Sequence, residues 1–597
     1  MWPRSKVPGE AVATAGLFAA LAVLTGLSVL WTPGNEGAIT QFNRTTLLLG
    51  VFLVGVVASR RGDAASWADG IAIGFTIIGL IALASRCFPD LFPDGELPEF
   101  LPSARNRLSY PINYWNALGI GVALVLPLLL RAAVASERAF LRGLWLAPIP
   151  ALGVTVYLTS SRGGVAVAAA GTLAFLALAG RRLVPVALAT VVALIGGLVA
   201  IVAVQSHTQL VEGPLDGTVS AAGRAAALEI AAVCAATGIA HLLLSSTHLR
   251  RVRLSRGAVG ATAMAATLML IGVAALADVG RRFADFKQPQ GFADTERQDF
   301  VRAHLLSGGG SGRWQFWSAA VDQWREAPLF GGGAGSYESW WAQNGTLAYF
   351  VRNAHSLFAE TLGELGLVGL CLLVGIFGVS LSSGAMRLRR ADDDGLAVAA
   401  LTAVIIAFVV GAALDWVWQI PVVAGVGVLA LALVTGPSTV GTAVTDGIAK
   451  SADVPRHPSR FGVGLAALAA CWIMLAIQVV PWLTQREISA SQAALARGER
   501  AEALDRAGRA RRLEPWAASP RLQLALVAEQ TDDLDRARRS IADALDRDRR
   551  NWRIWVVSAR INTRAGRFTE ARRDLGSARR LNPRSPLLSS ARARSAN

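Results

Sequence analysis

The sequence predicts an all-α fold: a polytopic membrane helical bundle followed by a C-terminal α-solenoid of about three short helical repeats. Apolar stretches of about 20 residues, the length that crosses roughly 30 Å of hydrocarbon as helix, recur along most of the chain. Of the 597 residues, 53% are hydrophobic and 17% are charged, whereas soluble chains carry about a quarter charged residues. The last part of the chain instead repeats every 34 residues.

This composition excludes a soluble enzyme, a secreted disulfide scaffold and a disordered chain. The cysteines show no CxxC pairing and lie in or beside apolar segments. They therefore indicate neither a metal site nor a disulfide framework. These cysteines are Cys87, Cys234, Cys371 and Cys471.

We count about thirteen membrane spans by length and hydrophobicity. The first follows Arg4 and Lys6 like a signal sequence, but Trp-Thr-Pro-Gly follows it in place of a small-residue cleavage site. We therefore expect an uncleaved anchor. The expected limits are 11–31, 45–59, 69–86, 112–131, 142–159, 163–180, 183–204, 222–245, 257–277, 355–381, 396–414, 417–436 and 462–483.

Positive charges predict the orientation. Alternate short loops carry clusters of basic residues, and the loops between them are poorer. Because basic loops stay in the cytoplasm, we expect a multi-pass protein of the cytoplasmic (inner) membrane with a cytoplasmic N-terminus. The long segment 278–354 and the C-terminal tail then lie outside. The clusters include Arg60 and Arg61, Arg181 and Arg182, Arg250 to Arg256, and Arg387 to Arg390.

The long outer segment contains a predicted amphipathic helix. Trp314, Trp317 and Trp324 recur at helical spacing, and Pro328 with the glycines of 331–335 ends the pattern. A loop of this length is usually functional. The alternative, that the tryptophans only dock at the bilayer interface, stays open.

The chain divides into a transmembrane domain, 1–484, with its outer loop at about 278–354, and an extracytoplasmic repeat domain, 485–597. Alanines recur at 34 residues in the tail, and Gly498, Asp532 and Gly566 fall between the expected helices. The tail resembles tetratricopeptide repeats, which stack into a concave surface that usually binds a partner, a protein among the possibilities. The alternative is that the tail is only a rigid cap.

The tail holds 25 Arg against 14 Asp and Glu. Because it has no motif that reads nucleic acid, this charge favours binding to anionic lipid or glycan over nucleic acid.

Three polar residues outside the repeats are candidates for chemistry. Arg162 lies in Ser-Ser-Arg-Gly-Gly between two spans, where small residues and exposed N–H groups beside a cation suit an anion. Arg313 begins the Trp-rich helix, and His355 opens a span with a ring that can take a proton near neutral pH. The alternatives are a snorkelling arginine, a solvated arginine and a structural histidine. Glu360 and Glu364 are expected to be packing or pore-facing residues.

Three segments together resemble the O-antigen ligase and polymerase superfamily of bacterial envelope proteins, over roughly residues 100–435. They are SSRGG at 160–164, GRWQFWSAAVDQWREAPLFGGGAGSY at 312–337 and NAHSLFAETLGELGLVGL at 353–370. The stretch Asn-Tyr-Trp-Asn at 113–116 is similar to an Asn-bearing element of that family. Several members also carry tetratricopeptide repeats after the last span.

The resemblance implies transfer of a glycan from a polyprenyl diphosphate to a hydroxyl acceptor, by a GT-C-like bundle without metal or cofactor. Arg162 and Arg313 would stabilise the diphosphate charge, and His355 would be the base. Asp294, Glu296 and Asp299 are expected to be solvated. The expected substrate-binding residues are Asn113, Asn116, Arg352, Gly335 and Tyr337.

Several functions remain open from the sequence alone. These residues do not separate a ligase, a polymerase and a protein O-oligosaccharyltransferase, so the acceptor is a polysaccharide, a lipid or a protein. A transporter of lipid-linked sugar needs charges near the bilayer midplane and internal repeats, and the sequence shows neither. A scaffold whose only active part is the repeat tail is the third possibility.

Overall fold

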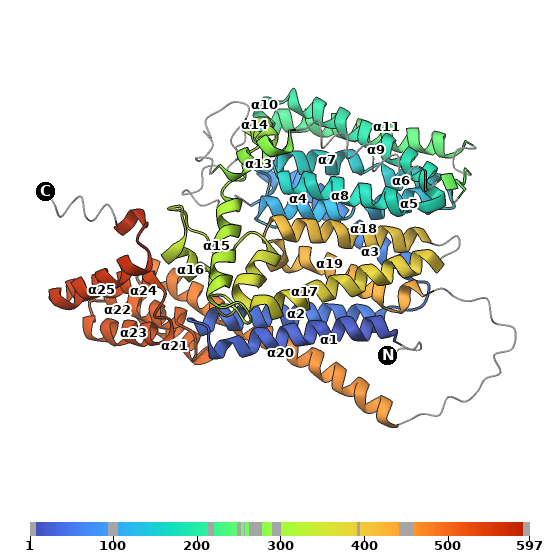
Figure 1. Cartoon of the computed structure of the whole chain (residues 1–597). Coiled ribbons are helices and arrows are strands. Elements are labelled where there is room, and N and C mark those ends of the chain that lie inside the picture. Colours follow the sequence, from blue (N-terminus) through green and yellow to red (C-terminus); the bar gives the residue numbers. More distant parts are fainter. Residues whose placement is uncertain are drawn as a thin grey trace. The chain divides into compact units, whose positions relative to one another are not determined.

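All regular elements in the described part of the chain are helices (Figure 1), as predicted. The computed structural model describes residues 7–93, 106–212, 220–247, 252–255, 257–258, 260–261, 278–288, 300–390, 395–440 and 458–588. Within these ranges, nine helices are long and apolar enough to cross a bilayer, and two shorter ones are apolar. The chain is therefore an all-α, multi-pass membrane protein.

The long apolar helices follow the expected spans closely. The second span is longer than predicted, because its helix already begins at Asn35, where polar residues hid it from the hydropathy pattern. The expected span 257–277 and the acidic residues Asp294, Glu296 and Asp299 lie almost wholly outside the described residues. The nine helices are Gly9–Leu30, Asn35–Ala58, Ala64–Cys87, Trp115–Ala135, Ala139–Leu158, Gly180–Gln205, Ala221–Ser245, Leu357–Arg390 and Gly395–Leu414; the shorter ones are Arg162–Leu178 and Pro421–Thr435.

The chain forms two compact units, and the first comprises Met1–Thr14, Val54–Gly312 and Phe377–Lys450. At its centre α8 (Arg162–Leu178) packs against α4 (Trp115–Leu124) and α18 (Gly395–Leu414). Its other helices are α3 (Ala64–Cys87), α5 (Leu126–Ala135), α6 (Ala139–Leu146), α7 (Ile149–Leu158), α9 (Leu183–Gln205), α10 (Thr208–Glu212), α11 (Ser220–Ser245), α13 (Val279–Lys287), α14 (Phe300–Leu306) and α19 (Pro421–Thr435).

Prolines divide two of the spans in this unit. Pro127 lies in the first turn of α5 and separates it from α4, and Pro148 separates α6 from α7. Proline has no N–H to donate to the preceding turn, so it ends or kinks a helix. The expected spans 112–131 and 142–159 are therefore each a pair of short helices.

The second unit comprises Ala15–Leu53, Arg313–Ile376 and Ser451–Asn597. It holds most of α1 (Gly9–Leu27) and α2 (Asn35–Ala58), and the first part of α17 (Leu357–Arg390). The outer loop adds α15 (Arg313–Glu326) and α16 (Tyr337–Asn344). Helix α15 begins and ends where the tryptophan spacing predicts it, and it packs against α16.

Helix α17 is broken near its start. Gly366 has φ +65° and ψ −164°, a conformation that an L-residue with a Cβ rarely adopts. The preceding loop fills the break: the Leu367 N–H donates to Pro328 O (2.9 Å) and the Val368 N–H to Leu329 O (3.2 Å). Non-helical backbone in a membrane helix persists only where its polar groups find partners in the protein.

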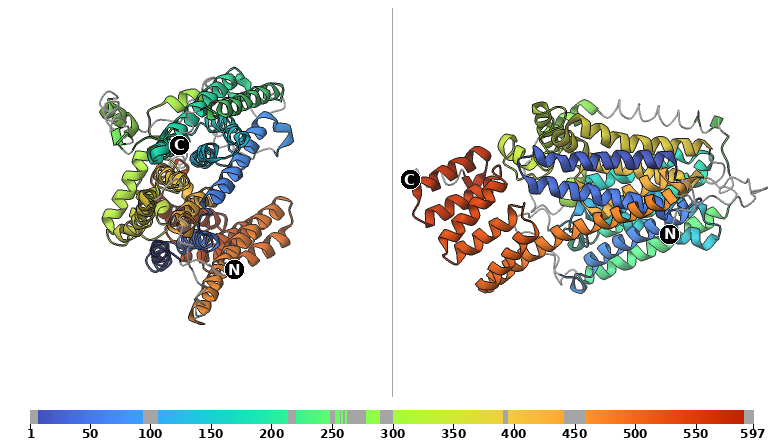
Figure 2. Two further views of the ribbon diagram at one scale, coloured as in Figure 1. Left: turned by 90° about the vertical axis from the view of Figure 1, so that its right-hand side faces the viewer. Right: turned by 90° about the horizontal axis from the view of Figure 1, so that it is seen from below.

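The tail is a series of helices that pack on their sequence neighbours (Figures 1 and 2). The three positions predicted between helices have left-handed backbone, with φ +81° at Gly498, +63° at Asp532 and +70° at Gly566. All six alanines of the 34-residue pattern are buried: Ala503, Ala510, Ala537, Ala544, Ala571 and Ala578. The helices are α20 (Pro458–Ala496), α21 (Arg500–Leu513), α22 (Ser519–Gln530), α23 (Leu534–Arg547), α24 (Trp552–Arg564) and α25 (Phe568–Leu581).

The buried alanines explain the period, because small side chains let paired helices approach closely.

Glu36 at the start of α2 fixes the beginning of α22. Its carboxylate accepts from the N–H groups of Ala518 (3.0 Å) and Ser519 (3.1 Å) and from Ser519 Oγ (2.6 Å). An acidic group at a helix N-terminus satisfies N–H groups that lack partners within the helix. The helix pairs fit tetratricopeptide repeats, an assignment that stays a prediction.

Candidate functional site

Arg162 occupies the first turn of α8, and its neighbours explain why it stands there. Ser161 caps the helix by accepting from the Gly164 N–H (3.0 Å). Gly164 faces Gly119 of α4 so closely that a Cβ on it would lie 3.0 Å from the Gly119 carbonyl carbon. The Ser-Ser-Arg-Gly-Gly segment therefore combines a cap with a tight helix crossing, and it fixes where the Arg162 side chain begins.

The half-buried Arg162 guanidinium binds the Gly/Ser stretch of the outer loop. Its Nη1 donates to Ser307 O (2.7 Å), Ser307 Oγ (3.1 Å) and Gly309 O (2.6 Å), and its Nη2 donates to Ser311 Oγ (2.8 Å). All these acceptors are neutral. Arg162 thus holds the segment that leads into α15, and its charge has no carboxylate among these partners.

A buried carboxylate that the sequence analysis missed lies at the start of α4. Asp415, just after α18, is fully buried and accepts from Tyr114 Oη (2.7 Å) and Asn116 Nδ2 (2.7 Å). The Trp416 ring stacks on Tyr114 at 4.3 Å between centroids. Asn116 therefore belongs to a hydrogen-bonded cluster, while Asn113 is exposed on the loop before it, with φ +60°.

The second unit holds His355 against α15. The His355 ring lies 5.3 Å from the Phe316 ring, and Trp317 Nε1 donates to His355 O (3.4 Å). Arg313 lies three and four residues before these two aromatics, which puts it on the same face of α15. The same helix therefore carries Arg313 in its first turn and the two aromatics that contact His355, while a joint role of Arg313 and His355 stays a prediction.

The backbone around His355 fixes its ring. His355 has φ +53°, and the Glu360 carboxylate holds the preceding turn by accepting from the Ala354 N–H (2.9 Å). Its Nδ1 lies 3.0 Å from Asn353 O. Because a carbonyl oxygen can only accept, Nδ1 carries the hydrogen, and in the neutral ring Nε2 is the nitrogen that can take a proton.

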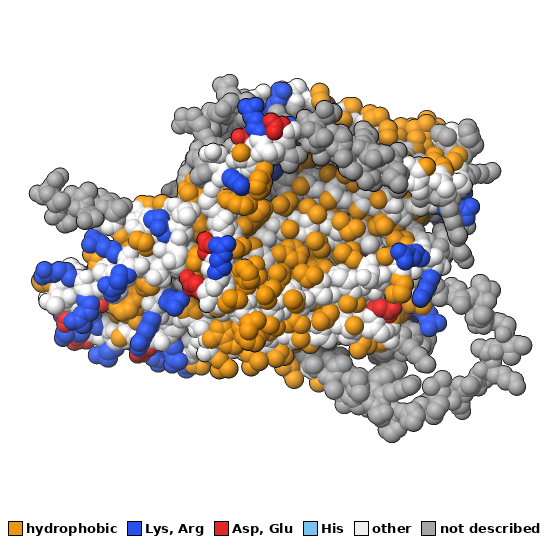
Figure 3. Space-filling view, viewed as in Figure 1, with side chains coloured by type: hydrophobic (Ala, Val, Ile, Leu, Met, Phe, Trp, Pro, Cys, Tyr) orange, Lys and Arg blue, Asp and Glu red, His pale blue; other side chains and the backbone are white. Residues whose placement is uncertain are grey.

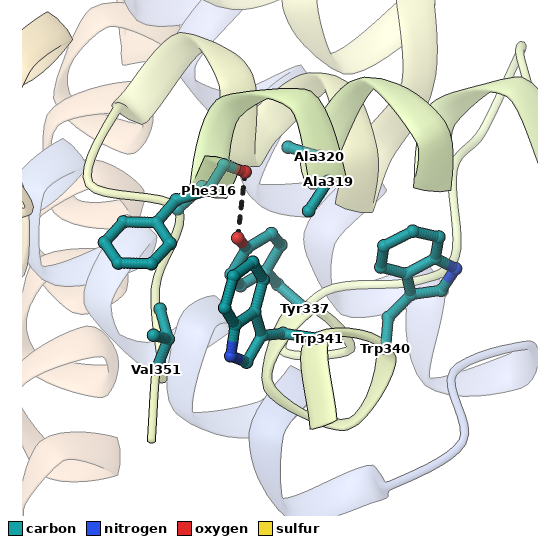
Figure 4. Close-up of a cluster of buried hydrophobic side chains, with 8 residues drawn as sticks. Phe316, Ala319, Ala320, Tyr337, Trp340, Trp341 and Val351 are labelled. Atoms are coloured by element: carbon teal, nitrogen blue, oxygen red, sulfur yellow. Dashed lines mark hydrogen bonds between the residues drawn. The ribbon is translucent and has the colours of Figure 1, made fainter. Parts of the chain in front are cut away.

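A cluster of buried aromatic and aliphatic side chains joins α15, α16 and the loop before His355 (Figure 4). Tyr337 is fully buried, and its hydroxyl donates to Phe316 O (2.9 Å). Burial, followed by the nearby Glu360 charge, raises the pKa of Tyr337 well above its ordinary value. The phenol therefore stays protonated as a donor. The cluster comprises Phe316, Ala319, Ala320, Tyr337, Trp340, Trp341, Val351 and Ala354.

Glu364 joins the glycine-rich loop to α17. Its carboxylate accepts from the N–H groups of Gly335 (2.9 Å) and Tyr337 (3.1 Å). Gly335 has φ +73°, and a Cβ there would lie 2.7 Å from Gly37 Cα. The backbone conformation and the close approach of Gly37 therefore require a glycine at position 335, and Tyr337 fills the buried aromatic cluster. A direct contact of either residue with substrate stays a prediction.

The repeat tail contacts the outer loop through arginines. Glu338 of α16 accepts from Arg553 Nη1 of α24 (2.8 Å) and from Arg352 Nε (3.3 Å). The Arg553 guanidinium also lies over the Phe350 ring, 4.4 Å from its centroid. The segment 350–352 thus lies between the tail and the turn that carries His355. No pattern along the chain indicates this contact, because Arg553 and Glu338 are 215 positions apart.

Taken unit by unit, the predicted residues form two groups. The first unit carries Arg162, Asn113 and Asn116. The second unit carries Arg313 and His355 together with Arg352, Gly335 and Tyr337. Among the residues that the structure describes, no three His, Cys, Asp or Glu side chains are grouped to hold a metal ion.

These features define a class: a multi-pass helical membrane protein whose large loop between spans packs a helix with aromatic side chains against a histidine. Residues 217–374, which include that loop, match the sequence model of a family described as O-Antigen ligase. Over this segment the chain is similar to that family. A comparison with curated proteins gives no match.

Proposed function

We propose that this protein is a glycosyltransferase that moves a glycan from a polyprenyl-diphosphate donor onto a hydroxyl acceptor, without a metal ion. It acts at the outer face of the cytoplasmic membrane, with its N-terminus in the cytoplasm and its outer loop and tail outside. The observation that carries the proposal is His355, which contacts Phe316 and Trp317 of α15 and has Nε2 as the nitrogen that can accept a proton.

The reaction follows from these groups. The acceptor oxygen attacks the anomeric carbon while the bond from that carbon to the phosphate oxygen breaks. The electron pair leaves with the polyprenyl diphosphate, and the acceptor proton passes to His355 Nε2. The leaving group gains negative charge in the transition state, so fixed cations nearby lower the barrier. Arg313, in the first turn of the helix that contacts His355, supplies one such cation.

Arg162 supplies the second cation in this proposal. Four of its hydrogen bonds go to two backbone carbonyls and two serine hydroxyls, which are uncharged. Phosphate oxygens are anionic and form stronger, bidentate hydrogen bonds with a guanidinium. Exchange of the neutral partners for a diphosphate is therefore favourable. Ser311, one of these partners, precedes Arg313 by two residues in the chain.

The remaining predicted residues divide by exposure. Asn113 and Arg352 are exposed and fit direct contacts with glycan or phosphate. Asn116, Gly335 and Tyr337 donate to Asp415, Glu364 and Phe316 O, and we assign them the role of holding the site in shape. The tail contributes to acceptor choice, because its Arg553 touches the segment next to His355.

Reconstituted transfer tests this function. Purified full-length protein in nanodiscs is given polyprenyl-diphosphate-linked glycan with a polysaccharide, a lipid or a protein acceptor, with and without a chelator. We expect glycan on one acceptor class, which separates ligase, polymerase and oligosaccharyltransferase, and no effect of the chelator. Donor that crosses the bilayer without any transfer to an acceptor would indicate a transporter instead.

A further inference from the structure

Two turns of the second unit expose large apolar side chains next to each other. Leu30 (82% exposed) and Trp31 (40%) follow α1, and Leu329 (61%) and Phe330 (50%) follow α15. The Trp31 and Phe330 rings meet edge to face, with centroids 6.2 Å apart. We call these four residues the apolar tip. An exposed apolar group of this size in a fixed position usually marks an interaction surface.

The tip is held rigidly. Thr32 Oγ1 donates to Ala334 O (3.1 Å), and the Ala334 N–H donates to Ser28 Oγ (3.0 Å), so the two turns are joined directly. The Leu367 N–H donates to Pro328 O (2.9 Å), which ties the second turn to the break in α17. The apolar side chains therefore cannot fold back into the protein, and they stay exposed unless something covers them.

The surroundings identify what covers the tip. It continues the exposed apolar faces of α1 and α17, both candidate membrane spans, and Figure 3 shows hydrophobic side chains gathered over these helices. Charged side chains occupy the last turn of α15 before the tip: Glu326 is exposed, and Arg325 pairs with Asp322 (2.7 Å). The Trp324 indole of the same turn donates to Pro328 O (3.0 Å), just before the tip.

Apolar side chains that continue a membrane span, with a tryptophan and charged side chains within the next turn, are typical of a bilayer interface. We propose that the apolar tip inserts into the bilayer at the boundary between acyl chains and headgroups. The outer loop is then anchored to the membrane at a second place besides its own spans. Because α15 ends at this turn, the depth of the tip fixes the height of Arg313 above the bilayer. That consequence rests on the proposed function, whereas the insertion itself does not.

Site-directed spin labelling tests the insertion. The full-length chain, with its native cysteines replaced by alanine, is labelled at F330C and reconstituted in vesicles of phosphatidylethanolamine and phosphatidylglycerol. The matched control is F350C, because Phe350 is also an exposed phenylalanine of the outer loop (65%) but lies under the Arg553 guanidinium. Power saturation then compares the accessibility of each label to oxygen, which enters the bilayer, and to a water-soluble nickel chelate.

We expect the ratio of oxygen to nickel accessibility to be severalfold higher at position 330 than at 350, and a label at L329C to behave like that at 330. Equal ratios at 330 and 350 would overturn the proposal. A label at 330 that neither reagent reaches would also overturn it, because that result indicates a protein contact such as a second copy. Transfer activity is not the readout, so a failure of the proposed function leaves this result interpretable.

Discussion

Replacing Arg553 with alanine tests whether the repeat tail steadies the loop that carries His355. The arginine is the main polar contact of α24 with that loop, through Glu338 and Phe350. Removing it leaves the tail helices intact, because its side chain lies outside their buried cluster. The change therefore loosens one contact without unfolding either partner.

The expected size follows from the geometry. The ion pair at 2.8 Å is partly exposed, with 39% and 30% of the two side chains accessible, and such pairs contribute about 0.2–1 kcal/mol. The guanidinium over Phe350 adds about 0.5–1 kcal/mol. Together they give about 1–2 kcal/mol, which corresponds to a change of about 5–30-fold in an equilibrium constant.

Hydrogen–deuterium exchange on the full-length chain in nanodiscs measures this change. We expect the amides of residues 345–354 to exchange about 5–30-fold faster in Arg553→Ala. The control is Arg549→Ala, because Arg549 pairs with Asp546 of its own repeat (2.9 Å). A double-mutant cycle with Glu338→Gln then isolates the pairwise part of the effect.

Equal exchange of residues 345–354 in the Arg553→Ala and Arg549→Ala proteins would refute this reasoning. The tail would then be attached to the chain without steadying the loop. Faster exchange throughout the tail in Arg553→Ala alone would show that Arg553 stabilises its own repeat instead.

Three further changes probe separate parts of the account. Arg162→Lys keeps the charge but loses the planar fork, so we expect kcat/KM to fall at least about tenfold, and about 100-fold or more for Arg162→Ala; unchanged steady-state kinetics in both would remove Arg162 from the site. Gly366→Ala places a Cβ against the Leu329 carbonyl at φ +65°, so thermal unfolding should show a loss of about 1–3 kcal/mol, and Gly378→Ala, where a Cβ meets nothing, should show none. Burial, followed by the Glu36 charge, raises the pKa of Glu514 to about 7, and burial raises that of Asp548 to about 6. Because both folded-state pKa values lie above the ordinary range, this stability is present at low pH and is lost as the pH rises. Tail unfolding followed by hydrogen exchange should therefore become easier by about 1–2 kcal/mol between about pH 5 and pH 8, and Glu514→Gln should flatten that dependence; an equal slope in the variant would contradict it.

Local patterns predicted the elements well. The spacing of three tryptophans and a proline located α15, and the 34-residue period located the tail turns at Gly498, Asp532 and Gly566. Both patterns follow from the geometry of a single helix or helix pair, so they appear as regular spacings in the sequence. The start of α2 was missed because its first turns are polar, and hydropathy detects only the apolar part of a helix.

The contacts between residues of the site could not be predicted from local sequence patterns. Asp415 meets Tyr114 across 301 positions, and Glu364 binds Gly335 across 29. Nothing in the periodicity of either segment indicates its partner. The two glutamates of α17 were expected to be packing or pore-facing residues, and the structure gives both a specific task, which is to accept backbone N–H groups of the loop before them.

The central claim is that Arg313 and His355 perform one glycan transfer, with His355 as the base. Single-turnover transfer from a defined polyprenyl-diphosphate glycan, measured against pH for His355→Ala, Arg313→Ala and the control His207→Ala, tests it most directly. His207 is a matched histidine because it belongs to the first unit, where it pairs with Glu229 (3.1 Å). The account predicts a fall of about 100-fold or more in the first two variants, loss of the acidic limb of the pH profile in His355→Ala, and wild-type behaviour in His207→Ala. A His355→Ala protein that keeps the wild-type rate and pH profile would contradict it.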